Sequence, residues 1–282
     1  MWKFLCFLPL LCLVLYSFHH RLTEPKFWLE DGKEVRELRT NLLNQLIPHS
    51  DGLMIRDITI PTFCQTDENR KKIGEGWQKV VFEADSIEEQ SGSIIKVPNL
   101  NGPNYISCLE SLEVEMCRLF ILRNSLREIR WMSILKNDNN VIQIKSYCIP
   151  EDPIKDIDKL SIRTEKGFPL TTLFLIQQTW GYRFNMIREI VQFLLRHPNI
   201  SFNDFRRQQF VVVDDHPKMV DLDGITFGSF DIDGELITQK VIKEFVNNYL
   251  LLDIPNHLRT SFNTSKIHSI RTLSELDSFL KL

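Results

Sequence analysis

The chain has 282 residues, of which 43% are hydrophobic and 25% are charged, and its formal net charge is -3. This length supports one large domain or two lobes that share a cleft. The negative net charge argues against a nucleic-acid-binding protein, because phosphate recognition usually requires a strongly basic face.

The first 22 residues differ in composition from the rest of the chain. Apolar residues run almost without interruption from Phe4 to Phe18. This run fits the core of a signal peptide and is short for a membrane span, which needs about 20 residues. We therefore expect residues 1–22 to be a signal peptide or, because no small-x-small cleavage site is visible, a retained signal-anchor. In both cases the rest of the chain would face the secretory lumen, and it would contact a membrane only if the leader is retained.

The cysteines outside this leader are Cys64, Cys108, Cys117 and Cys148. An even number in an oxidising compartment indicates disulfides, and the sequence leaves all three pairings open. A zinc site is not expected, because the sequence has no CxxC spacing. The triplets that begin at Asn199 and Asn263 are acceptors for N-linked glycans, which agrees with a secretory route.

Residues 23–70 are expected to form an N-terminal extension, in which apolar residues at helical spacing predict a helix over 34–47. From Lys71 onward, short apolar runs bounded by turn residues predict strands. These strands are expected within 71–84, where a Gly-x-Gly turn separates two of them, and within 92–100, 140–149 and 159–170. A long amphipathic helix is expected over 113–137.

Helical patterns dominate beyond the Gly/Pro break that ends the last of these strands. Helices are expected over 171–180, 182–197 and 236–252. A hairpin at 202–224 interrupts them, with strands "FVVV" and "MV". The expected fold class is therefore α+β, with a β-rich lobe that carries one long helix and a mainly helical lobe. The expected boundaries are 71–164 for the first lobe, 165–168 for a hinge and 169–282 for the second lobe.

Two features of the β-rich half are candidates for a site. Gly74 and Gly76 flank a turn between two strands; glycines let a backbone lie against a phosphate chain, but hairpin turns often contain two glycines. Lys96 lies inside an apolar strand, where a lysine is either an edge residue facing solvent or a buried cation with an anionic partner. Glu128 on the long helix is the candidate partner, and its alternative is a plain surface glutamate.

The hairpin at 202–224 carries acidic candidates at both ends. Asp204 precedes the first strand and is either a turn or helix-capping residue or a group that accepts a proton from a hydroxyl. Asp221 and Asp223 follow the second strand, where two carboxylates at this spacing either ligate a metal through hard oxygens or make simple turn contacts. The Asp214-Asp215 pair between the strands is expected to be a solvated turn.

The spacing of these candidates is more specific than any of them alone. A protein-kinase pattern requires a Gly-x-Gly turn, a strand lysine, a helix glutamate, a catalytic aspartate with an amide five residues on, and a metal-binding aspartate after the next strand. The chain holds these groups in this order, as Gly74-x-Gly76, Lys96, Glu128, Asp204, Gln209 and Asp221. The sequence therefore predicts a bilobal, protein-kinase-like fold.

Two segments, "LREIRWMSILKNDNNVIQIKSYC" and "FNDFRRQQFVVVDDHPKMVDLDG", carry a family resemblance, together with Cys117. They resemble the vertebrate lonesome kinase family of secreted tyrosine kinases, and the resemblance extends from about Lys71 to Phe227. It implies a kinase in the Golgi lumen or outside cells. Such an enzyme would use ATP with Mg²⁺ or Mn²⁺ to phosphorylate tyrosine on secreted or luminal proteins.

The resemblance also implies catalytic roles. Lys96 would hold the ATP phosphates and pair with Glu128. Asp204 would orient the substrate hydroxyl and accept its proton, and Arg206 would neutralise the transferring phosphoryl group. Such a site works by positioning and charge neutralisation, with little covalent chemistry from the protein.

The same resemblance implies the residues that hold the nucleotide and the metal. Asp221 would hold the metal that bridges the phosphates, and Gln209 would replace the usual asparagine as a metal ligand. The backbone from Glu165 to Gly167 would meet the adenine. The remaining ATP-binding positions would be Gly74, Gly76 and Val81.

The chain departs from the kinase pattern at several positions. Lys79 replaces the third glycine of the Gly-rich loop, Ile94 stands where a small alanine usually lies above the adenine, and Asp223 stands in place of a glycine. Phe202-Asn203 replaces the His-Arg before the catalytic aspartate, and no Ala-Pro-Glu follows, so the substrate-binding segment over 225–235 is expected to be short. These departures leave a second hypothesis open: a pseudokinase that binds a partner or nucleotide without transfer.

A third hypothesis rests on "DLD" at 221–223. This Asp-x-Asp fits a luminal glycosyltransferase that holds Mn²⁺ and a nucleotide sugar, and a related hypothesis is a kinase with a sugar hydroxyl as acceptor. None of these hypotheses involves nucleic acid as a partner.

Overall fold

The structure is a computed structural model that describes residues 70–84, 92–202, 204–227, 230–259, 262 and 264–281. All described residues belong to one compact unit of the chain. The expected leader and the expected helix at 34–47 lie outside the described residues, as do Cys64 and Asn263. Within the described ranges, no helix is long and apolar enough to cross a bilayer.

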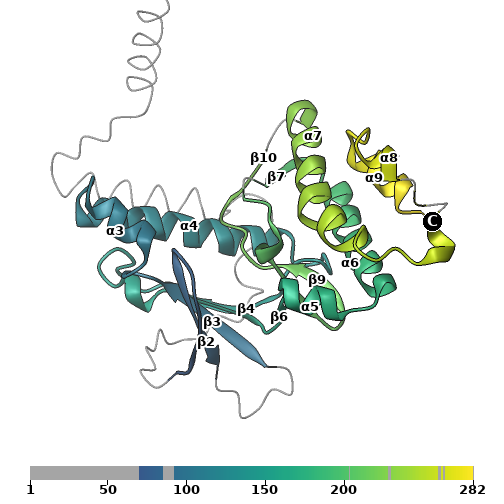
Figure 1. Ribbon diagram of the computed structural model, residues 1–282. Coiled ribbons are helices and arrows are strands. Elements are labelled where there is room, and N and C mark those ends of the chain that lie inside the picture. Colours follow the sequence, from purple (N-terminus) through teal and green to yellow (C-terminus); the bar gives the residue numbers. More distant parts are fainter. Residues whose placement is uncertain are drawn as a thin grey trace, which may run out of the picture. The chain divides into compact units, whose positions relative to one another are not determined.

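A five-stranded antiparallel sheet is the first feature of the described chain (Figure 1). Its strands are β1 (Lys72–Glu75), β2 (Lys79–Ala84), β3 (Ser93–Pro98), β4 (Ile144–Cys148) and β5 (Ser161–Glu165), in the order β1-β2-β3-β5-β4. β3 is central, and its Lys96 is in register with Val81 of β2 and Ile162 of β5. The apolar, β-branched sequence of β3 suits a position between two other strands.

The long helix that the sequence predicted over 113–137 is α4 (Val114–Ile134). It runs alongside the sheet (Figure 1) and packs against β4. Its buried side includes Leu122, Leu126 and Ile129, at the three- and four-residue spacing of one helix face. Glu128 of the same helix is fully buried, and a carboxylate that has lost its water requires a charged or hydrogen-bonding partner.

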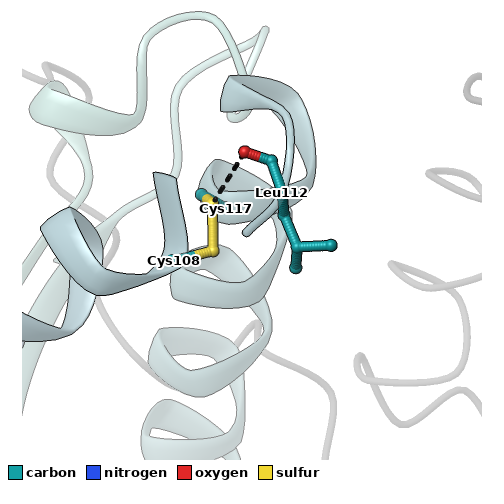
Figure 2. Close-up of a disulfide and its surroundings, with 3 residues drawn as sticks. All are labelled: Cys108, Leu112 and Cys117. Carbon is teal, nitrogen blue, oxygen red and sulfur yellow. Dashed lines mark hydrogen bonds between the residues drawn. A yellow bond between two sulfur atoms is a disulfide. The ribbon is translucent and has the colours of Figure 1, made fainter. Parts of the chain in front are cut away.

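A short helix that the sequence did not predict, α3 (Pro103–Leu109), precedes α4. Proline at its first position suits a helix start, because the missing N–H would lack an intrahelical partner there. A disulfide between Cys108 and Cys117 joins α3 to the first turn of α4, and Leu112 lies in the loop between them (Figure 2). Cys148 is disulfide-bonded as well. The expected disulfides are confirmed, and Cys108–Cys117 is one of the pairs that the sequence left open.

Two small antiparallel sheets and several helices follow β5. One sheet has the order β6-β8-β9, from β6 (Phe168–Pro169), β8 (Phe210–Val213) and β9 (His216–Met219), and the other pairs β7 (Ile200–Phe202) with β10 (Ile225–Phe227). The helices are α5 (Thr172–Gln177), α6 (Trp180–Arg196), α7 (Phe230–Val241) with a π-helical continuation over Ile242–Leu250, α8 (Thr264–Ile267) and α9 (Leu273–Phe279). Single 3₁₀ turns lie at Ile157–Lys159, Arg207–Gln209 and Asn256–Leu258.

This mixture of a β-sheet region with several helices agrees with the expected α+β class. α9 packs against both α6 and α7 (Figure 1). The arrangement as two lobes, with boundaries at 71–164, 165–168 and 169–282, stays a prediction.

Threonine caps determine where α5 and α6 begin. The Thr171 hydroxyl accepts the backbone N–H of Phe174 at 3.0 Å, and the Thr179 hydroxyl accepts that of Tyr182 at 3.2 Å. The sequence predicted one helix through residue 180, but α5 ends at Gln177 because Thr179 is extended and caps the next helix.

The hairpin at 202–224 has the predicted turn between its strands and differs from its prediction in two details, the start of β9 and a contact of Asp215. β9 begins at His216, earlier than the predicted "MV", because pairing continues from Val213 directly across the turn. Asp214 and Asp215 have φ angles of 49° and 65°, as a tight turn between twisted strands requires. Asp215 also accepts a hydrogen bond from the Tyr182 hydroxyl at 3.2 Å, so it is more than a solvated turn residue.

Aromatic side chains anchor the segment before this hairpin. Phe205 is buried and makes edge-to-face contacts with Phe202, Phe210 and Phe245, with ring centroids 5.6 to 6.3 Å apart. Such pairs contribute roughly 0.5–1.5 kcal/mol each beyond the area they bury. Because Phe205 follows Asp204 directly, its burial fixes the backbone that presents that carboxylate.

A polar cluster ties the loop after α4 to the end of α6. Asp138 Oδ2 lies 2.8 Å from His197 Nε2, Asp138 Oδ1 lies 2.9 Å from Arg196 Nη2, and the backbone N–H of Asn140 donates to Asp138 Oδ1 at 2.8 Å. Burial alone would raise the pKa of Asp138. The hydrogen bonds from His197 and Arg196 outweigh it and hold that pKa well below its usual range.

We expect Asp138→Asn to lower the free energy of unfolding by about 1–3 kcal/mol at pH 7, because it removes a charged acceptor of several hydrogen bonds. A depressed carboxyl pKa stabilises the folded state fully above the unfolded pKa of about 3.9, and the effect is lost as pH falls through the folded pKa. Urea titrations at pH 7 and pH 3 should therefore show the difference between wild type and variant narrowing at the lower pH. An equal difference at both values would contradict this account of Asp138.

Candidate functional site

Lys96 and Glu128 form a buried ion pair between β3 and α4. Lys96 Nζ lies 2.7 Å from Glu128 Oε1, and both side chains are almost fully covered. Lys96 Nζ also donates to the carbonyl oxygen of Val220, just beyond β9. The structure thus separates the two alternatives for Lys96: it lies on a central strand with an anionic partner, and not on a sheet edge facing solvent.

Lys79 reaches the same carboxylate from β2. Its Nζ lies 2.6 Å from Glu128 Oε2, 3.0 Å from Asp221 Oδ1 and 2.9 Å from Asp223 Oδ2. We call this group the ionic cluster; its members are Lys79, Lys96, Glu128, Asp221 and Asp223. It joins two strands, the long helix and the turn after the hairpin, which lie far apart in the sequence.

Lys79 stands in the sequence as the replacement of a glycine, and the kinase pattern does not predict its contacts. Strand alternation together with the register of β2 and β3 explains them. Lys79 and Val81 are two residues apart on β2, so their side chains share a face of the sheet. Val81 is directly opposite Lys96 in the antiparallel ladder, so Lys96 shares that face as well.

Within the ionic cluster, the pKa values of the two aspartates are shifted in opposite directions. Burial alone would raise the pKa of Asp221, but the charges of Lys79 and Lys96 outweigh it and lower that pKa to about 2. Burial raises the pKa of Asp223, with Asp221 and Glu128 adding to the effect and Lys79 opposing it. Burial would lower the pKa of Lys79, but the three carboxylates outweigh it and raise that pKa well above its usual value. Asp221 is therefore the more acidic aspartate and is ionised at neutral pH.

Asp204, Arg206 and Gln209 form a second polar group. Gln209 Nε2 donates to Asp204 Oδ2 at 2.9 Å, and Arg206 Nη2 lies 2.7 Å from the same oxygen. Gln209 is buried, whereas about half of the Asp204 and Arg206 side chains is exposed. A solvent-facing carboxylate that two neighbours orient is suited to receive a hydroxyl group.

Two contacts place this second group beside the ionic cluster. The backbone N–H of Val220, directly before Asp221, donates to the Gln209 carbonyl at 2.9 Å. A Cβ atom added to Gly224 would lie 3.9 Å from the backbone nitrogen of Asp204. The segment of Asp204 and the turn that carries Asp221 therefore pack side by side.

Two asparagine side chains hold the turn between β1 and β2 in place. The Gly76 N–H donates to the Lys79 carbonyl at 2.8 Å, and the Asn99 amide donates to the Gly76 carbonyl at 2.9 Å. Asn124 of α4 donates to the side chain of Gln78 at 3.2 Å. Gly74 is in register with Val81 across β1 and β2. These contacts set the position from which Lys79 extends.

Glu165 and Gly167 lie where β5 leads to β6. Glu165 Oε1 lies 2.7 Å from Lys218 Nζ and accepts the backbone N–H of Gln143 at 2.8 Å. A Cβ atom at Gly167 would lie 2.5 Å from Val211 Cγ2, so only glycine fits against β8 there. The side chain of Glu165 is thus occupied in joining β5 to β9, and the assignment of its backbone to a nucleotide stays a prediction.

The donor atoms around Asp221 fit a hard divalent cation. Carboxylate oxygens and the amide oxygen of Gln209 are the ligand types that Mg²⁺ and Mn²⁺ take. In the part of the chain that the structure describes, no group of three or more His, Cys, Asp or Glu side chains is arranged as a metal cage. Mg²⁺ sites that also use substrate phosphates take one or two ligands from the protein, and Asp221 and Gln209 would be these ligands.

No protein-family profile matches the chain. A curated relative, the human "Extracellular tyrosine-protein kinase PKDCC", is 28% identical over 158 residues. The match covers 54% of this chain and 31% of that protein, so it spans under a third of the relative's length. The similarity supports a kinase-like relationship for the chain.

Proposed function

We propose that the chain is a protein kinase of the secretory pathway that transfers the γ-phosphate of ATP to tyrosine on secreted or luminal proteins. The observation that carries the proposal is the buried pair of Lys96 and Glu128 next to Asp221, with Asp204 on the adjoining segment. A buried lysine fixed by a helix glutamate beside an ionised aspartate is the arrangement that protein kinases use for phosphoryl transfer. The similarity to a named tyrosine kinase supports the same conclusion.

Each residue has a role that follows from its charge and surroundings. Lys96 neutralises phosphate oxygens, and Glu128 holds its ammonium in place. Asp204 orients the acceptor hydroxyl and takes its proton, while Arg206 balances the negative charge of the transferring phosphoryl group. Because these groups are held by packing before the substrate arrives, little reorganisation is needed during the reaction.

ATP and a divalent cation are the cofactors that this proposal implies. Asp221 and Gln209 would hold Mg²⁺ or Mn²⁺, which supplies positive charge to the phosphates when bound. Gly74, Gly76 and Val81 would line the nucleotide on the β1–β2 side. The backbone of 165–167 would receive the adenine.

Three features support a secretory location, either in the Golgi lumen or outside cells. The disulfides of Cys108, Cys117 and Cys148 suit an oxidising compartment. Asn199 in its glycosylation triplet is exposed, as an acceptor must be. The relative is described as extracellular. Contact with a membrane would require the leader at 1–22 to be retained.

One observation favours a second candidate, a pseudokinase that binds nucleotide or a partner without transfer. Lys79 already contacts Asp221, the carboxylate that a kinase offers to its metal, and Asp223, which stands where kinases have a glycine. A glycosyltransferase that uses the Asp-x-Asp at 221–223 is less consistent with this arrangement, because it gives no reason for the buried Lys96–Glu128 pair.

Isothermal titration calorimetry with ATP and Mn²⁺ tests the nucleotide site. We expect the wild type to bind ATP and Lys96→Met to bind it at least about tenfold more weakly, a loss of about 1.4 kcal/mol. Lys72→Met is the matched control, because it removes an equal charge from the same sheet at an exposed ion pair with Glu75. Binding of a UDP-sugar in place of ATP, or equal ATP affinity in wild type and Lys96→Met, would contradict the proposal.

A further inference from the structure

The ammonium of Lys79 lies between the two aspartates of the ionic cluster. It is 3.0 Å from Asp221 Oδ1 and 2.9 Å from Asp223 Oδ2, and its third carboxylate contact is Glu128 Oε2 at 2.6 Å. The ammonium donates hydrogen bonds to the two aspartates, and Glu128 Oε2 is its third ion-pair partner. The Lys79 side chain is only 14% exposed, so few water molecules reach its ammonium to compete with the carboxylates.

The two lysines of the cluster have different partners. Lys96 contacts Glu128 and the carbonyl of Val220, whereas Lys79 contacts Glu128 and both aspartates. Glu128 therefore contacts both lysines, through Oε1 for Lys96 and through Oε2 for Lys79. Lys79 provides the positive charge at the two acidic side chains after the hairpin.

A divalent cation held by Asp221 would have to lie close to Lys79 Nζ, which is 3.0 Å from Asp221 Oδ1. Carboxylate oxygens hold Mg²⁺ at about 2.0–2.1 Å, so the two cations would share one carboxylate. Two cations cannot share that place, because their repulsion in a partly buried site is only weakly screened. Lys79 must therefore leave these oxygens before a divalent cation takes them.

We propose that Lys79 is the resident counter-ion of Asp221 and Asp223 and that it sets the affinity of this site for divalent cations. The inference rests on the proposed function, which assigns the metal to Asp221. Without nucleotide, Lys79 holds the carboxylates and the metal binds weakly. When a metal arrives with nucleotide phosphates, the flexible stem of Lys79 lets its ammonium turn from the carboxylates to those phosphates. Metal and nucleotide therefore bind together far more strongly than the metal binds alone.

Titration of the full chain with Mn²⁺, followed by the paramagnetic resonance signal of the free ion, tests this role without measuring activity. In nucleotide-free protein, we expect Lys79→Met to bind Mn²⁺ at least about tenfold more tightly than wild type, because a competing charge has been removed. Lys79→Arg should bind as weakly as wild type, and so should the control Lys72→Met. Asp221→Asn added to Lys79→Met should abolish the gain.

A second arm repeats the titration with ATP present. ATP should strengthen Mn²⁺ binding to wild type by a larger factor than it strengthens binding to Lys79→Met. Lys79→Gln serves if the methionine variant does not fold. If Lys79→Met and Lys79→Gln bind Mn²⁺ no more tightly than wild type, the proposed role of Lys79 is wrong. The same holds if no variant binds Mn²⁺. A gain in metal affinity without ATP binding would instead leave Lys79 in this role and reject the kinase proposal.

Discussion

Glu128→Ala is expected to lower the free energy of unfolding by about 3–5 kcal/mol and to remove ATP binding. The substitution leaves the buried ammonium of Lys96 without its carboxylate and removes the shortest ion pair of Lys79. Removing one partner of a buried ion pair costs more than the pair itself contributes, because the remaining charge has lost its water as well. Urea unfolding at pH 7 measures the stability, and calorimetry with ATP and Mn²⁺ measures the binding.

Two further variants show whether the loss of stability comes from breaking the buried ion pair. Glu115→Ala, on the exposed first turn of the same helix, should change the stability by only a few tenths of a kcal/mol. Glu128→Leu combined with Lys96→Met replaces both charges with apolar groups and should recover part of the lost stability while ATP binding stays absent. A loss below about 1 kcal/mol in Glu128→Ala would show that the pair is not buried in solution.

Asp204→Asn should slow phosphoryl transfer by about 10²–10⁴-fold and leave the affinity for ATP within about twofold. The reason lies in the surroundings of the Asp204 carboxylate. The carboxylate is exposed on a segment that Phe205 anchors, and Gln209 and Arg206 orient it toward solvent, where an acceptor hydroxyl would bind. Asparagine keeps the shape and cannot take a proton. The measurement is the rate of phosphate transfer from γ-labelled ATP to a tyrosine-containing peptide.

Asp214→Asn is the matched control for this change. Asp214 lies in the exposed turn of the same hairpin, and asparagine tolerates its positive φ as well as aspartate does. Its transfer rate should equal that of wild type. Equal rates for wild type and Asp204→Asn would remove Asp204 from the reaction.

Residue spacing predicted the α+β class and one contact of the site, the Lys96–Glu128 pair. The order of strand lysine, helix glutamate and post-hairpin aspartate places Lys96, Glu128 and Asp221 on elements that a kinase pattern brings together. The structure has Lys96 and Glu128 at 2.7 Å and brings Asp221 to the same cluster through Lys79. Their roles in catalysis stay predictions, as does the two-lobe arrangement.

The missed features share a physical cause, which is that their stability comes from tertiary contacts. α3 is a seven-residue helix without an apolar stripe, so no hydrophobic pattern predicted it. Its proline start and its disulfide to α4 did not indicate a helix by themselves. β7 and β10 have three residues each and exist only as a pair. In the sequence, Lys79 stands out only because it replaces a glycine. The register of β2 with β3 is needed to show that its side chain faces the site.

The most direct test of the central claim is the detection of phosphotyrosine. The full chain is incubated with γ-labelled ATP, Mg²⁺ or Mn²⁺, and a mixture of secreted proteins, and the labelled residues are identified by mass spectrometry. The account predicts labelled phosphotyrosine with wild type and its near absence with Asp204→Asn. Binding of ATP by wild type without phosphotyrosine in either metal would contradict the account and identify the chain as a pseudokinase.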